Sequence, residues 1–146
     1  MMATQRRAHT TWEGDLAHGS GTFTVGSGAM GPQEVSWAAR TEEPGGKTSP
    51  EELIAAAFSS CFSMALSGAL ARAGTPPTTL ETDAVATFAQ TDAGFRMTKI
   101  DVRVRGTVEG VDEEAFRRAA EDANENCPVS QALKGNVELT LDAALA

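Results

Sequence analysis

Cysteine is scarce in this sequence: Cys61 and Cys127 are the only two among 146 residues. A stable structural disulfide suits an oxidising compartment, but the N-terminal residues lack the apolar stretch of roughly 7–15 residues that a secretory signal requires. We therefore expect a cytoplasmic protein, in which a lone pair of thiols points to redox chemistry. The alternative for either cysteine is a small buried hydrophobe without reactivity.

Basic residues are also in the minority. Lys and Arg together number 12 against 20 Asp and Glu, which gives a formal net charge of -8. Proteins that bind nucleic acid usually present a basic stripe, and anionic membranes attract basic surfaces. The composition therefore weighs against both, and the expected partner is a small molecule or another protein.

Histidine is as scarce as cysteine, with His9 and His18 alone. The four residues show no zinc-ligand spacing, so no metal site is expected. A cysteine hydrolase would need a histidine base beside its thiol, and both histidines lie in or near the first predicted strand. That alternative depends on the fold bringing one of them to a cysteine.

Linkers and internal repeats are absent, so we expect a single domain over residues 1–146. One long uncharged segment, residues 53–71, has the length of a membrane span. Its alanines, serines and glycine make it only weakly apolar. It predicts a buried helix of a soluble protein, and its small residues all round suggest that a dimer covers it.

Local patterns predict the elements in order. Short strands are expected at 10–14, 22–26 and 34–40 and would form an N-terminal β-meander. The third strand is predicted because Val35, Trp37 and Ala39 alternate with the residues between them. The first helix has Ser49 as N-cap, Pro50 at its first position and Glu52 to close a capping box, and should run to about residue 73.

The second half predicts a hairpin, a helix and a last strand. The hairpin strands are 80–90 and 95–108, and the helix runs from its cap Asp112 to about residue 126. A short helical turn at 129–134 precedes a strand at 137–141. The order βββαββαβ gives an α+β fold.

The two cysteines have different surroundings. The helical neighbours of Cys61 are apolar, and desolvation would raise its thiol pKa, so a reactive Cys61 needs a nearby cation. Arg40, just before the loop to the helix, is the best candidate, although a solvated surface arginine is the plain alternative. Cys127 precedes Pro128 and can cap a short helix whose backbone N–H groups favour a thiolate, so local chemistry alone suggests Cys127 as the first nucleophile.

Several motifs, in order and over nearly the whole chain, resemble the osmotically inducible protein C (OsmC) family, which includes the organic hydroperoxide resistance proteins. The helix cysteine together with Cys-Pro-Val-Ser is the most specific part. The N-terminal segment that contains Trp12 is more similar to the OsmC branch of the family than to the branch of the organic hydroperoxide resistance proteins. The segments that carry the resemblance are Trp12-Glu13-Gly14-Asp15, Thr48-Ser49-Pro50-Glu51-Glu52-Leu53-Ile54, Cys61-Phe62-Ser63-Met64-Ala65, Asp92-Ala93-Gly94-Phe95 and Cys127-Pro128-Val129-Ser130-Gln131-Ala132-Leu133-Lys134.

The resemblance implies a thiol-dependent peroxidase that reduces organic hydroperoxides, built as an intertwined homodimer around a central buried helix that carries Cys61. It implies that Cys61 attacks the peroxide and that Cys127 resolves the resulting sulfenic acid as a disulfide. Arg40 would hold the Cys61 thiolate and polarise the peroxide, and Glu51 would orient the arginine. Arg6 and Arg7 are less fitting candidates for the arginine.

Helix geometry adds a constraint on Glu51. Glu51 and Cys61 are ten residues apart on one predicted helix, or roughly 15 Å along its axis at 1.5 Å per residue. If Glu51 serves Cys61, it should therefore come from the partner subunit. The alternative is a first-turn acid favoured by the helix dipole.

The apolar residues around Cys61 are candidates for substrate binding. Phe58, Phe62 and Met64 would favour hydroperoxides with organic tails, unless they are plain core residues. The resemblance implies no metal, haem or flavin, a dithiol reductant such as a lipoylated protein, thioredoxin or a small thiol, and a role in oxidative or osmotic stress defence. A non-catalytic redox sensor or thiol-binding protein on the same scaffold is the alternative, and the sequence leaves the substrate and the electron donor open.

Overall fold

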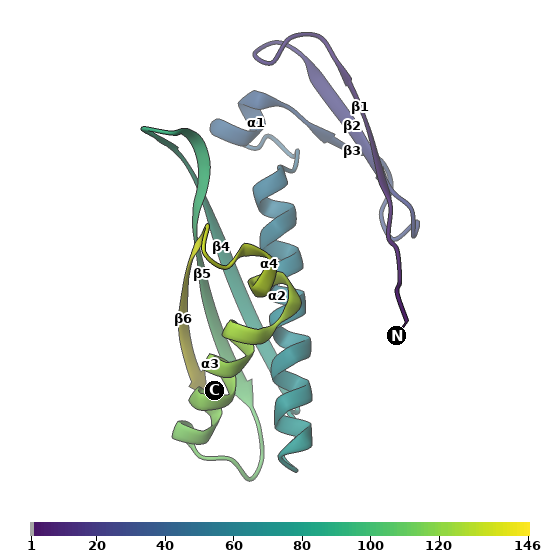
Figure 1. Ribbon diagram of the computed structural model, residues 1–146. Helices are drawn as coiled ribbons and strands as arrows, with labels where there is room; N and C mark the ends of the chain where they lie inside the picture. The colour runs from purple at the N-terminus through teal and green to yellow at the C-terminus, as the bar shows by residue number, and fades with distance from the viewer. Residues whose placement is uncertain (1) are drawn as a thin grey trace. The chain divides into compact units, whose positions relative to one another are not determined.

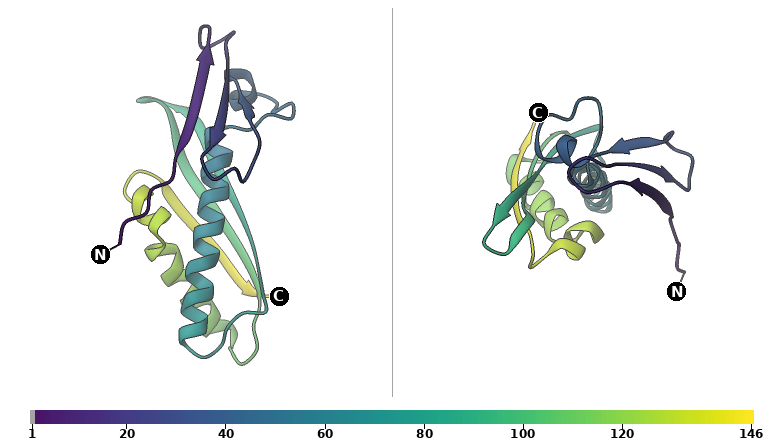
Figure 2. Two further views of the ribbon diagram at one scale, coloured as in Figure 1. Left: turned by 90° about the vertical axis from the view of Figure 1, so that its right-hand side faces the viewer. Right: turned by 90° about the horizontal axis from the view of Figure 1, so that it is seen from above.

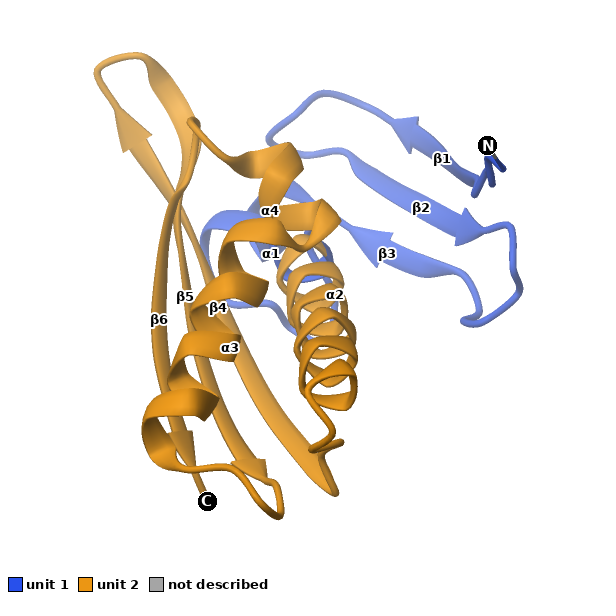
Figure 3. Ribbon diagram, turned by 60° about the horizontal axis from the view of Figure 1, so that its bottom comes forward, with its two compact units in different colours: residues 1–53 blue, residues 54–146 orange. Residues whose placement is uncertain are grey.

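The computed structural model describes residues 2–146. The chain divides into two compact units, residues 1–53 and residues 54–146, coloured separately in Figure 3. The predicted α+β class is confirmed, while the single domain over residues 1–146 stays a prediction. Each unit holds one three-stranded sheet.

The first unit contains an antiparallel sheet in the order β1-β2-β3. Its strands are β1 (Ala8–Glu13), β2 (Ser20–Val25) and β3 (Gln33–Val35), so the predicted meander is confirmed. Trp12 pairs with Gly21 across β1 and β2. A Cβ at residue 21 would lie 2.8 Å from Trp12 Cε3, so the glycine makes room for the indole.

The prediction of a strand through residue 40 is wrong beyond Val35. Helix α1 (Trp37–Thr41) begins there, with Ser36 as its N-cap. The Ser36 hydroxyl accepts a hydrogen bond from the Ala39 N–H at 3.1 Å. A side-chain cap followed by two alanines, which are strong helix formers, outweighs the alternation of apolar residues that suggested a strand. Arg40 therefore lies on a helix, one turn after Trp37.

Helix α2 (Pro50–Arg72) forms as predicted (Figure 1). The Glu52 N–H donates to the Ser49 hydroxyl at 3.2 Å, and the Glu52 carboxylate accepts from the Thr48 hydroxyl at 2.7 Å. Gly74, at φ +85°, ends the helical segment.

One stripe of α2 is buried, formed by Phe58, Phe62, Leu66 and Leu70 at intervals of four residues. The opposite side is open, and Met64 there is 74% exposed. By length and composition alone, α2 could also cross a membrane, a test that the core helix of a soluble protein passes as well. In the single chain α2 is thus covered on one side only, with small residues dominating the rest.

The sheet of the second unit has the order β4-β5-β6. Strands β4 (Thr79–Thr91) and β5 (Gly94–Thr107) form the predicted hairpin, with a register shift between Thr87 and Phe88. The last strand, β6 (Glu138–Leu145), pairs with β5 in parallel. A parallel pair needs a crossover connection, which the intervening helices supply.

That crossover contains α3 (Glu113–Asn126) and the short α4 (Pro128–Leu133). Helix α3 begins at the predicted cap, where the Asp112 carboxylate accepts from the Ala115 N–H at 2.7 Å. Helices α2 and α3 lie on the same face of the sheet, as the views in Figures 2 and 3 show. Helix α4 confirms the predicted short helical turn, and α1 is the one described helix that was not predicted.

The core of the second unit lies between this sheet face and the helices. It contains Ile100, Val102 and Val104 of β5, the α2 stripe, and Phe116, Ala120 and Ala123 of α3. Gly106 of β5 makes room for α3, because a Cβ there would lie 2.6 Å from Phe116 Cε2 and Cζ. Cys127 belongs to the same core and is 1% exposed.

Candidate active site

Cys61 and Cys127 are brought together in the second unit. Cys61 is partly buried and packs against the core cluster that contains Cys127, and Cys127 is close enough to influence the pKa of the Cys61 thiol. Both are free thiols. Two sequence-predicted site residues that are far apart in the chain therefore meet in one place.

Local backbone geometry fixes Cys127. It ends α3 and is the N-cap of α4, as its position before Pro128 predicts. Its sulfur accepts a hydrogen bond from the Ser130 N–H at 3.4 Å and lies 3.0 Å from the Ser130 hydroxyl. The Cys127 thiol is thus held at the first turn of α4 and shielded from solvent.

The electrostatics of Cys61 follow its surroundings. Burial raises the pKa of the Cys61 thiol above its ordinary value, as its apolar neighbours predict. A backbone hydrogen bond from Val129 lowers the pKa, whereas the side chain and charge of Cys127 raise it further. Two adjacent residues of the first turn of α4 therefore act on the thiols: Ser130 donates its N–H to the Cys127 sulfur, and the backbone of Val129 offsets part of the rise in the pKa of Cys61.

Arg40 and Glu51 form an ion pair in the first unit. Arg40 Nη2 donates to Glu51 Oε1 at 2.7 Å, and Arg40 Nε lies 3.1 Å from both carboxylate oxygens. The Glu51 side chain is 10% exposed and that of Arg40 is 31% exposed. Arg40 Cζ also lies 5.9 Å from the centroid of the Trp37 ring, within the range of a cation–π contact.

The structure thus joins the four predicted catalytic residues as two pairs, one in each unit. Cys61 pairs with Cys127, and Arg40 pairs with Glu51. The carboxylate that the resemblance assigns to orienting the arginine does contact that arginine. Glu51 lies in the first turn of α2, so the position also suits the helix dipole.

The three residues suggested for substrate binding do not share one surface. Phe58 and Phe62 are fully buried in the core, whereas Met64 faces solvent. The phenylalanines fit the core alternative of the sequence analysis. Their role toward substrate stays a prediction.

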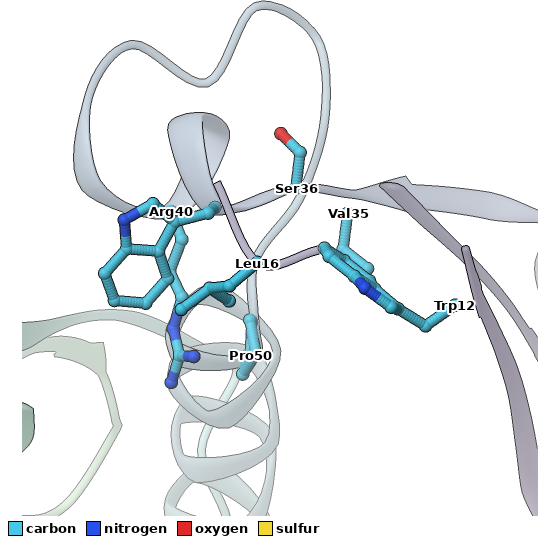
Figure 4. A pocket seen from close by; sticks show the side chains of 7 residues that line it. Trp12, Leu16, Val35, Ser36, Arg40 and Pro50 are labelled. Atoms are coloured by element: carbon cyan, nitrogen blue, oxygen red, sulfur yellow. The ribbon is translucent and has the colours of Figure 1, made fainter. Parts of the chain in front are cut away.

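A pocket of about 280 Å³ beside Arg40 was missed from the sequence. Figure 4 shows its lining side chains, with Leu16 toward Arg40, Trp12 on the far side beside Val35, and Pro50 at the helix start. Apart from Arg40 and Ser36, the lining is apolar: Trp12, Leu16, Val35, Trp37 and Pro50. The only sequence signal for it is Trp12, part of the opening motif, because the pocket depends on the α1 helix that the pattern did not predict.

The two histidines belong to the first unit. His9 and His18 are exposed, and His18 Nδ1 lies 3.2 Å from the Asp15 carboxylate. Within residues 2–146, no group of three or more His, Cys, Asp and Glu side chains is placed to hold a metal ion.

Comparison with known proteins identifies the family of the chain. The family model described as OsmC-like protein matches residues 43–142. The peroxiredoxin OsmC of Escherichia coli K12 is 42% identical over 141 residues, which are 97% of this chain and 96% of the relative. The organic hydroperoxide resistance protein OhrA of Bacillus subtilis is 33% identical over 101 residues, covering 66% of this chain and 67% of OhrA.

Solved structures agree as well. The crystal structure of the organic hydroperoxide resistance protein OhrB of Bacillus subtilis superposes with a TM-score of 0.73 and 25% identity, covering 94% of this chain and 97% of OhrB. An organic hydroperoxide resistance protein from Elizabethkingia anophelis gives 0.73 and 25%, covering 99% and 100%. With its paired thiols, its fold and these relatives, the chain belongs to the OsmC family.

Proposed function

We propose that this protein is a cysteine-based peroxidase that reduces organic hydroperoxides to alcohols. The observation that carries the proposal is the meeting of Cys61 and Cys127 beside the first turn of α4. The names of its relatives, a peroxiredoxin and organic hydroperoxide resistance proteins, support the same class of reaction.

The reaction has two steps. The Cys61 thiolate attacks the outer oxygen of the hydroperoxide, the O–O bond breaks, and the alkoxide leaves and takes up a proton as the alcohol. Cys61 is then a sulfenic acid. Cys127 attacks this sulfur, the S–O bond breaks, and hydroxide leaves with the thiol proton as water. A dithiol, such as a lipoylated protein, thioredoxin or a small thiol, reduces the resulting disulfide.

Arg40 and Glu51 supply the cation that a buried Cys61 requires. A guanidinium beside the sulfur stabilises the thiolate and the developing charge on the peroxide oxygen. The carboxylate of Glu51 holds that guanidinium through two nitrogens, which fixes its plane. Since ten helical residues separate Glu51 from Cys61, the pair serves Cys61 of the partner subunit in a homodimer.

Exposed surface in the single chain supports the homodimer. Only Phe23 and Ala39 are buried hydrophobic residues in the described part of the first unit, and every residue of β1 is exposed. The open side of α2 carries Met64 and several small residues. A unit of about 50 residues usually needs additional cover to be stable, and a second copy of the chain would supply it.

The organic part of the substrate has two candidate sites. Phe58, Phe62 and Met64 adjoin Cys61 in sequence, but the two phenylalanines offer no accessible surface. The apolar pocket beside Arg40 is open and is large enough for a short hydrocarbon tail. Each buried methylene would add about 0.8 kcal/mol to binding, which favours organic hydroperoxides over hydrogen peroxide.

The proposed setting is the cytoplasm, in defence against oxidative and osmotic stress, without a metal or organic cofactor. The reaction is tested by counting free thiols and measuring intact mass after one equivalent of an organic hydroperoxide. We expect wild type to lose both thiols, Cys127→Ser to trap an oxidised Cys61, and Cys61→Ser to stay unchanged. Survival of both wild-type thiols would reject the peroxidase and leave the redox sensor or thiol-binding protein.

A further inference from the structure

Ser130 is a fully buried polar residue whose hydroxyl and N–H both contact Cys127. It is 1% exposed, and its hydroxyl donates to the Cys127 backbone carbonyl at 2.9 Å. The same hydroxyl lies 3.0 Å from Cys127 Sγ, and the Ser130 N–H donates to that sulfur at 3.4 Å. Three contacts therefore join Ser130 to a single cysteine.

The hydroxyl has one proton, which decides the direction of these bonds. While it donates to the carbonyl, its oxygen can only accept from the Cys127 S–H. Once Cys127 has lost its proton, the hydroxyl can rotate and donate to the negatively charged sulfur, alongside the N–H. Ser130 thus has an acceptor for the thiol and donors for the thiolate.

We propose that Ser130 is a positioning residue that holds Cys127 Sγ for attack on Cys61. This inference rests on the proposed function, in which Cys127 is the resolving thiol. In the step concerned, the Cys127–Cys61 S–S bond forms and the Cys61 S–O bond breaks. The Cys127 sulfur is oxidised, the Cys61 sulfur is reduced, and the departing hydroxide takes the thiol proton.

The position of Ser130 suits it to stabilise the charged form of the Cys127 thiol. Cys127 is buried, so solvent does not solvate its charged form, and hydrogen bonds from the protein take the place of water. Val129, the preceding residue, packs against the same core cluster as Cys61. The first turn of α4 therefore holds the Cys127 sulfur beside that cluster, and Ser130 supplies the side-chain contact to the attacking sulfur.

The experiment compares Ser130→Ala, Ser130→Thr and the matched control Ser63→Ala. Ser63 is a partly buried serine whose hydroxyl likewise forms hydrogen bonds, to the Ser59 carbonyl and the Thr82 hydroxyl. After one equivalent of organic hydroperoxide, we expect Ser130→Ala to form the Cys61 sulfenic acid at the wild-type rate. It should close the disulfide about tenfold more slowly, as for loss of a hydrogen bond to a charged group. Excess hydroperoxide should therefore convert more Cys61 to sulfinic acid.

A second readout does not depend on peroxide chemistry. An aromatic disulfide reagent that releases thionitrobenzoate first labels the more accessible Cys61, and attack by Cys127 then releases a second thionitrobenzoate. We expect the second phase alone to slow in Ser130→Ala, to recover in Ser130→Thr, and to be normal in Ser63→Ala. A wild-type rate of the second phase in Ser130→Ala would overturn the inference. Failure of the hydroperoxide to oxidise Cys61, with a slowed second phase, would reject the peroxidase but retain the role of Ser130.

Discussion

The guanidinium of Arg40 donates hydrogen bonds from Nε and Nη2 to the carboxylate of Glu51, and both residues lie in the first unit. Glu51 and Ser130 are the two buried polar residues in the described part of the chain. A buried carboxylate is costly without a cation, so the pair should matter for stability as well as for chemistry.

Arg40→Gln should lower the free energy of unfolding by about 2 kcal/mol, because it leaves Glu51 without its cation. The expected loss is below the ~3–5 kcal/mol of a fully buried pair, since the Arg40 side chain is 31% exposed. Urea denaturation measures it. The control is Arg118→Gln, whose ion pair with Glu114 is exposed and should change stability by less than about 0.5 kcal/mol. Equal effects of the two substitutions would contradict the structural role of the pair.

Mixing inactive chains tests whether the arginine and the thiol come from different subunits. Glu51→Ala and Cys61→Ser should each be inactive alone. A heterodimer of the two contains one site with an intact Cys61 and an intact partner Glu51, so peroxidase activity should return to a substantial fraction of wild type after subunit exchange. Arg40→Gln mixed with Cys61→Ser should behave in the same way. No recovery in heterodimers of verified composition would mean that each chain completes its own site.

The reactivity of Cys61 toward an alkylating agent should depend on Arg40. Burial raises the pKa of Cys61, and a guanidinium beside the thiolate would lower it. In a Cys127→Ala background, which removes the second thiol, adding Arg40→Gln should move the alkylation profile to higher pH. The rate at neutral pH should fall accordingly. Identical pH profiles of alkylation with and without Arg40→Gln would show that Arg40 does not lie near Cys61.

Gly106 is predicted to be intolerant of even a methyl group. A Cβ there would overlap the buried Phe116 ring, so Gly106→Ala should lower the free energy of unfolding by about 1–3 kcal/mol. Gly31→Ala is the matched control, because a Cβ at Gly31 meets nothing within 4 Å. Combining Gly106→Ala with Phe116→Leu should recover part of the loss. Unchanged stability of Gly106→Ala would show that the ring shifts freely.

Local signals in the sequence predicted most elements. The caps Ser49 and Asp112 mark the starts of α2 and α3 within a residue, because their side chains bond to nearby backbone N–H groups. The position of Cys127 as a cap was predictable in the same way. Helix α1 was not predicted, because Val35, Trp37 and Ala39 alternate as in a strand. A helix of five residues is also too short to show a repeating helical pattern of apolar residues.

Contacts between distant segments could not be predicted from the residues alone. The parallel pairing of β6 with β5, and the burial of Phe62 rather than its exposure to a ligand, depend on tertiary packing. The meeting of Cys61 with Cys127 was expected only from the family resemblance. The three contacts of Ser130 and the pocket beside Arg40 appear only once the backbone is in place.

The proximity of Cys61 and Cys127 also has a thermodynamic consequence. A covalent bond between them would close a loop from residue 61 to residue 127 in the unfolded chain, and the lost chain entropy corresponds to about 4 kcal/mol. The oxidised form would resist heat and denaturant better than the reduced form. Each catalytic cycle would then alternate between a more stable disulfide form and a less stable dithiol form. The melting temperature of a sample would therefore report how much of the protein is oxidised.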